Sequence, residues 1–180
     1  AILLLGSGAL IGARLPGKRI PLGDDLRDLL CDEFLGGEFK QDNLAHVSAI
    51  ATSQNSLSIV QDFIKNYFIG LEPADFHLKI PEFKWRALFT TNYDRLIETC
   101  YERNTGRVQN YSLMLSNQDD FDESRTTNDI VPVVKLHGCI TRTHDDQLPL
   151  ILTVDQYNDS LHSRKRLFNH LYELAYENTI

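Results

Sequence analysis

The sequence RALFTTNYD, from Arg86 to Asp94, contains the pattern on which the predicted fold depends. Arg86 to Thr90 is typical of a short buried strand, and Arg95 to Asn104 has apolar residues at helical spacing. Polar side chains with hydroxyl, amide and carboxylate groups lie where the two elements meet. Ligands bind at the carboxyl ends of the strands in open parallel sheets. The stretch therefore predicts a strand, a helix and, between them, a candidate site formed by Thr90, Thr91, Asn92 and Asp94.

The same succession of buried strand and polar turn occurs twice more in the chain. Leu3 to Leu5 precedes Gly6-Ser7-Gly8, and Ile130 to Leu136 precedes His137-Gly138, with Pro132 indicating an early or irregular strand position. Further helices are predicted at 22–34, 44–51, 57–68 and 164–177, and further strands at 108–113 and 150–153. The polar stretch 116–129 predicts a surface loop. Short apolar strands that alternate with longer helices predict an α/β fold with a parallel sheet covered by helices on both faces.

Composition narrows the class of protein. The 180 residues fit one domain, and the net charge of -7 argues against broad nucleic-acid binding, which requires clustered positive charge. Cys31, Cys100 and Cys139 are odd in number and show no C-x-x-C spacing, so we expect reduced thiols in a cytoplasmic protein without a zinc module or another metal site. No apolar run approaches the roughly 18 residues of a membrane span.

Each polar turn has a chemical and a structural interpretation. Gly6 and Gly8 would let a backbone approach a phosphate closely, but a ligand-free turn fits equally well. Asn92 could orient a water or a sugar hydroxyl, although residue types alone favour a helix N-cap for this segment. His137 could act as a general base, although a lone histidine is more often structural. Cys139 is interpreted as a small strand-end residue, and the run Arg164-Lys165-Arg166 as a helix-start surface.

Together and in this order, the motifs resemble those of sirtuin-like domains in bacterial NAD-consuming proteins, many of them antiphage defence effectors. Such domains show G-[AS]-G-x-S, then F-T-T-N-Y-D, then [KE]-L-H-G. The corresponding residues here are Gly6-Ser7-Gly8-Ala9, Phe89 to Asp94, and Lys135 to Gly138. Leu152-Thr153 with Asp155-Gln156-Tyr157 also resembles the family segment L-T-x-x-[DE]-Y. The resemblance spans nearly the whole chain, and the second and third motifs are the specific ones.

The resemblance implies that residues 1–180 are a Rossmann-like NAD-binding domain with NAD as substrate and no metal. It implies that Asn92 positions a water or ribose, that His137 is the base, and that Asp94 supports the nicotinamide-ribose side of the pocket. Gly6, Ser7, Gly8 and Ala9 would face the phosphates, and Thr90, Thr91 and Gly138 would complete the cofactor-binding set. Because the chain begins within an apolar run and ends as a helix closes, we expect a fragment that lacks the start of its first strand and later strands.

The sequence also departs from the family pattern. Deacylating sirtuins carry an Ile-Pro-Asp-Phe-Arg segment, whereas the nearest stretch here is Arg19-Ile20-Pro21-Leu22-Gly23. They also carry a four-cysteine zinc module, which this chain lacks. The leading hypothesis is therefore an NAD hydrolase that forms nicotinamide and ADP-ribose, as the effector domain of an antiphage protein. The alternatives are a module that senses NAD or ADP-ribose, and an NAD-dependent protein deacylase. Regulation by further domains, partner subunits or homo-oligomerisation is expected, without a membrane or direct nucleic-acid contact.

Overall fold

The computed structural model describes residues 1–119, 129–145 and 149–177. The strands are β1 (Ile2–Leu5), β2 (Ala87–Thr90), β3 (Asn110–Met114) and β4 (Ile130–Lys135). The α-helices are α1 (Gly23–Phe34), α2 (Leu44–Asn55), α3 (Leu57–Phe68), α4 (Leu96–Arg103), α5 (Val154–Ser163) and α6 (Lys165–Glu177). Short 3-10 helices are η1 (Ser7–Leu10), η2 (His77–Glu82) and η3 (Ile140–Arg142). Much of the loop predicted at 116–129 lies outside the described residues.

The strands form one parallel sheet in the order β1-β2-β4-β3, which confirms the predicted sheet type. The last strand along the chain, β4, lies between β2 and β3. Its pairing with β2 begins at Val133, so Pro132 precedes the paired residues on that side, in agreement with the early position predicted for it. All residues of β2 are buried, as expected for a strand that is covered on both faces.

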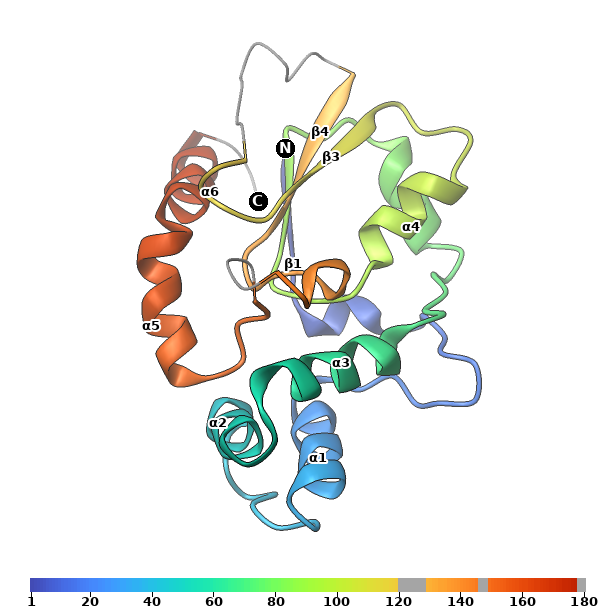
Figure 1. The fold of residues 1–180 in the computed structure, drawn as a ribbon. Helices are drawn as coiled ribbons and strands as arrows, with labels where there is room; N and C mark the ends of the chain where they lie inside the picture. The colour runs from blue at the N-terminus through green and yellow to red at the C-terminus, as the bar shows by residue number, and fades with distance from the viewer. Residues whose placement is uncertain (120–128, 146–148, 178–180) are drawn as a thin grey trace.

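Helices cover both faces of the sheet, as predicted, in a Rossmann-like arrangement. Successive side chains of β2 point to opposite faces: Phe89 packs toward Leu167 and Leu174 of α6, while Leu88 packs toward Ile97 and Tyr101 of α4. Figure 1 shows α6 on one side of the strands and α4 on the other. This arrangement places the carboxyl ends of β1, β2 and β4 next to one another.

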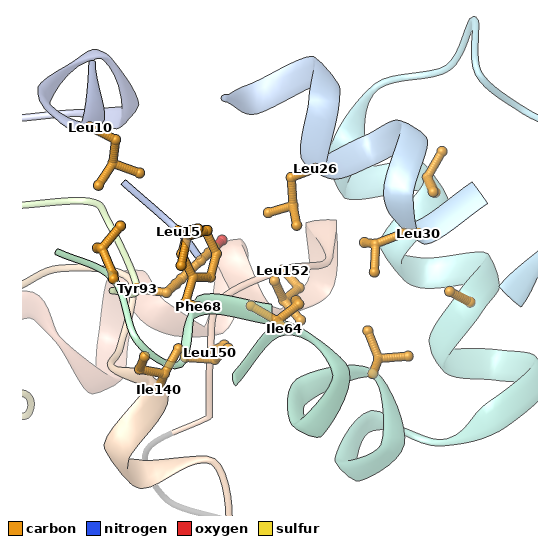
Figure 2. Close-up of a cluster of buried hydrophobic side chains, with 14 of the residues drawn as sticks. Leu10, Leu15, Leu26, Leu30, Ile64, Phe68, Tyr93, Ile140, Leu150 and Leu152 are labelled. Atoms are coloured by element: carbon orange, nitrogen blue, oxygen red, sulfur yellow. The ribbon is translucent and has the colours of Figure 1, made fainter. Parts of the chain in front are cut away.

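A layer of α1, α2 and α3 lies beyond the carboxyl-terminal end of β1 (Figure 1). The side chain of Asn43 caps α2 by accepting a hydrogen bond from the His46 N–H at 2.9 Å. Helix α3 buries Val60, Ile64 and Phe68, which recur at helical spacing. Figure 2 shows Ile64 and Phe68 in one cluster with side chains that follow the strands, namely Tyr93, Ile140, Leu150 and Leu152. The helical layer is thereby anchored to the turns at the end of the sheet.

Two features near the carboxyl end of the chain differ from the prediction. The strand predicted at 150–153 is instead a buried irregular segment, because distant groups bind its backbone N–H groups. Leu150 N–H donates to Gln61 Oε1 (2.6 Å), and Ile151 N–H donates to the His137 carbonyl (2.9 Å). The helix α5 was not predicted. Its signal is a capping box in which Thr153 and Gln156 bind each other's backbone N–H groups.

Candidate functional site

The three predicted turns meet at one edge of the sheet. The Thr91 N–H donates to the Leu5 carbonyl (3.2 Å), and the Leu136 N–H donates to the Thr90 carbonyl (2.9 Å). The Asn92 side-chain Nδ2 also donates to the Gly6 carbonyl at 2.9 Å. The side chain of Asn92 thus joins the glycine turn to the turn after β2. Because β4 pairs with β2 in parallel, the turn after β4 lies next to the turn after β2.

The glycine turn leaves an open surface. Gly6, Ser7 and Gly8 are exposed, and the four residues of η1 follow in place of a longer helix. Neither Gly6 nor Gly8 has a positive φ, and a Cβ on Gly8 would meet no atom within 4 Å. By contrast, Gly12 has a φ of +88° and its Cβ would lie 2.8 Å from the Phe76 ring. Folding therefore accounts for Gly12 but not for Gly8, where the main chain is exposed and a side chain would have room.

The turn after β2 presents the amide of Asn92. Thr90 is buried, and its hydroxyl oxygen accepts a hydrogen bond from the Asn92 N–H at 3.0 Å. The side chain of Asn92 is half-buried, and its Nδ2 donates to the Gly6 carbonyl. No described residue hydrogen-bonds to Asn92 Oδ1. The geometry leaves this oxygen as an acceptor for a water or a hydroxyl at the sheet edge.

Asp94 is more deeply placed than Asn92. It is 3% exposed, and its Oδ1 accepts a hydrogen bond from the N–H of Leu96, the first residue of α4, at 2.8 Å. Asp94 thus binds the first N–H of α4 from one residue before the N-cap, Arg95, whose own side chain makes no cap hydrogen bond. Its other oxygen, Oδ2, is buried without a hydrogen-bond partner among the described residues. Burial raises the pKa of Asp94 above its usual range.

His137 is half-buried after β4, with its ring against Tyr157 of α5. The ring centroids lie 5.1 Å apart in an edge-on arrangement with an interplanar angle of 87°. Burial, together with the charge of Arg164, lowers the pKa of His137 to about 4. The imidazole is therefore neutral at neutral pH and can accept a proton. No described residue hydrogen-bonds to its ring nitrogens.

Gly138 has a structural reason to be glycine. Its φ is +95°, a conformation that residues with a side chain rarely adopt. A Cβ at this position would lie 2.9 Å from the Pro149 carbonyl oxygen. Gly138 therefore allows the irregular segment 149–152 to pack directly on the turn that carries His137.

Three buried polar residues near the site were not predicted. Arg164, expected on a surface, is 3% exposed and donates to the carbonyls of Leu136 (2.7 Å) and Pro149 (3.0 Å). Lys135 is buried and forms an ion pair with Glu98. His77 links η2 to the glycine turn, because its Nε2 lies 2.8 Å from the Ala9 carbonyl and its Nδ1 accepts the Ala74 N–H. A charged residue inside the apolar run of β4 was a readable signal for Lys135. The local pattern held none for Arg164.

Neither a metal-binding cluster nor a membrane-spanning helix occurs in the part of the chain that the structure describes. Across residues 1–119, 129–145 and 149–177, no group of three or more histidine, cysteine or acidic side chains could hold a metal ion. Cys139 is fully buried, as the packing interpretation expects. Within the same ranges, the helices are too short or too polar to cross a membrane.

The comparison with known families identifies the chain. The family model of the SIR2-like domain matches residues 86–180, more than half of the chain, and includes the turns that carry Asn92 and His137. The glycine turn lies outside the matched residues. No curated protein matches the chain. The protein therefore belongs to the SIR2-like domain family, whose members are typically NAD-dependent enzymes.

Proposed function

We propose that this protein is an NAD⁺ hydrolase that forms nicotinamide and ADP-ribose, and that it acts as the effector domain of a bacterial antiphage defence protein. The observation that carries the enzymatic proposal is the placement of two polar groups on neighbouring turns at one edge of the sheet. Asn92 Oδ1 and the ring of His137 both lie on turns after adjacent parallel strands, and no described residue hydrogen-bonds to either. The defence role rests on the resemblance of the motifs alone.

The proposal assigns each part of the NAD molecule to a group at this edge of the sheet. The exposed turn Gly6-Ser7-Gly8 would offer main-chain groups to the pyrophosphate. Asn92 is hydrogen-bonded to this turn at the Gly6 carbonyl. The ribose next to nicotinamide would then reach Asn92 and His137. Asp94 would support the Asn92 turn through its hydrogen bond to the Leu96 N–H. Thr91 is half-buried beside Gly6, whereas Gly138 is buried and would act by shaping the turn that carries His137.

The reaction needs a leaving group, an acceptor and a base. The bond between the ribose carbon and the nicotinamide nitrogen breaks, and its electron pair neutralises the positively charged ring. Positive charge develops on the ribose, where the Asn92 carbonyl oxygen can stabilise it. Water then forms the new C–O bond and gives its proton to the neutral His137. The products are nicotinamide and ADP-ribose.

The test is nicotinamide release from NAD⁺ by the full-length protein and by the variants Asn92→Ala and His137→Ala. Both variants are expected to fold and to lose about 100-fold or more of the turnover, because each removes a group that acts on the reacting atoms. His162→Ala, which alters an exposed histidine of α5, is the matched control and should retain turnover. Undiminished release by Asn92→Ala or His137→Ala would refute the assignment.

The same assay separates the alternatives. A sensor would bind NAD⁺ or ADP-ribose in calorimetry without releasing nicotinamide. A deacylase would release nicotinamide only when an acyl-lysine peptide is added. Either outcome would replace the hydrolase proposal.

A further inference from the structure

Lys135 is a buried cation placed between the two reactive turns. It is the last residue of β4, two residues before His137, and it is 1% exposed. Its Nζ donates to the main-chain carbonyl of Asp94, two residues after Asn92. It also forms an ion pair with Glu98 of α4, with 3.0 Å between Nζ and Oε1. One side chain thus joins the strand that leads to His137 with the turn and helix that follow Asn92.

The groups around Lys135 indicate what a charged donor provides at this buried position. Asp94 and Glu98 are both buried, and one oxygen of each, Oδ2 and Oε2, has no hydrogen-bond partner among the described residues. The thiol of Cys139 lies 3.8 Å from Glu98 Oε1. A pair of well-packed apolar side chains would often be as stable as a buried ion pair. An apolar side chain, however, could not donate to the Asp94 carbonyl and so could not hold this turn.

We propose that Lys135 is a positioning residue that holds the Asn92 turn against the His137 turn, so that both groups reach the same ribose. The inference rests on the proposed function for its catalytic consequence. It assigns Lys135 no contact with substrate. The ion pair with Glu98 keeps the ammonium charged and directed, and the hydrogen bond to Asp94 transmits its position to the main chain.

The decisive comparison is between Glu98→Gln and the double variant Lys135→Met/Glu98→Gln. Both lack the Glu98 charge, and only the second lacks the donor to the Asp94 carbonyl. Removing both charges of the ion pair avoids leaving the Glu98 carboxylate buried and unpaired, so we expect the double variant to fold. Its kcat for nicotinamide release should be about 10- to 100-fold lower than that of Glu98→Gln, because a shift of about 1 Å in a reacting group has effects of this size. KM should change little, since Lys135 does not bind substrate.

A second measurement is independent of catalysis. The side-chain amide of Asn92 bonds to the Gly6 carbonyl, so its NMR resonances report the position of the turn. In Lys135→Met/Glu98→Gln these resonances should shift or broaden relative to Glu98→Gln. An equal kcat in the two folded variants would overturn the proposal. Should the wild-type protein release no nicotinamide, the hydrolase proposal fails, and unchanged Asn92 resonances would then overturn the positioning role by themselves.

Discussion

The turn after β2 and the turn after β4 are both held by a buried cation that donates to a main-chain carbonyl. Lys135 donates to Asp94 in the first turn, and Arg164 donates to Leu136 in the second. Lys135 has Glu98 as an ion-pair partner. Arg164 has no acidic ion-pair partner among the described residues, and burial lowers its pKa to about 10. Both cations thus fix a turn through a hydrogen bond to its main chain, but their electrostatic environments differ.

The difference matters for the groups nearby. The charge of Lys135 is paired with the Glu98 carboxylate, and it counteracts part of the rise that burial causes in the pKa of Asp94. Arg164, which pairs with no acidic side chain among the described residues, lowers the pKa of His137 in addition to the larger effect of burial. The charge of Lys135 therefore works against the effect of burial on the pKa of Asp94, whereas the charge of Arg164 adds to the effect of burial on the pKa of His137.

The largest expected effect comes from removing one partner of the ion pair. Lys135→Met leaves Glu98 buried and unpaired, and should reduce the free energy of unfolding by about 3–5 kcal/mol at pH 7. Arg164→Met strands no carboxylate among the described residues, so it should cost less, about 1–3 kcal/mol for the carbonyls that lose donors. Urea unfolding measures both. A smaller loss for Lys135→Met than for Arg164→Met would contradict the distinction drawn between the cations.

The next effect distinguishes Gly138, which the packing requires, from Gly8, which it does not require. Gly138→Ala forces a side chain into a φ of +95° and against the Pro149 carbonyl. The expected loss is roughly 3 kcal/mol, which combines backbone strain with overpacking. Gly8→Ala meets open space and should leave the unfolding free energy nearly unchanged while it weakens NAD⁺ binding in calorimetry. Equal stability losses for the two variants would show that the contrast between these glycines is wrong.

The electrostatic role of Arg164 predicts a shift in pH dependence. Activity that depends on neutral His137 should fall as the pH drops through its pKa of about 4. Arg164→Gln removes the repelling charge and should raise that pKa, so turnover is lost at a higher pH, by roughly one pH unit. Burial keeps the new value below 6.5, because it is the larger cause. An acid limb of kcat that stays in place would exclude this role for Arg164.

The smallest effect concerns stability in acid. The pKa of His137 is lowered in the folded state, so the unfolded chain binds a proton in the window between about 4 and 6.5 that the folded chain does not. The unfolding free energy should therefore fall as the pH is lowered through this window, by on the order of 1 kcal/mol at pH 5. His137→Asn should lose this component. Urea midpoints at pH 7 and pH 5 for the two proteins would detect it, and parallel decreases would exclude it.

The sequence was informative where patterns are local. Apolar runs predicted β1, β2 and β4, and the polar residues after them predicted the three turns. The segment 150–153 was misassigned because an apolar run of this length suits a strand, whereas Gln61 and His137 bind its backbone instead. The missed helix α5 had a readable capping box at Thr153 and Gln156. The roles of Asn92, Asp94 and His137 remain predictions.

The sequence by itself determined the type and order of most elements and the placement of Asn92 and His137 after strands, because periodicity and turn chemistry depend on neighbouring residues. Only the tertiary structure decided that β4 inserts between β2 and β3, that Asn92 bonds to Gly6, and that Lys135 and Arg164 are buried. The partners of these side chains are far away in the chain. Their positions follow from how the sheet is assembled, since a buried cation must find carbonyl or carboxylate oxygens wherever packing brings them.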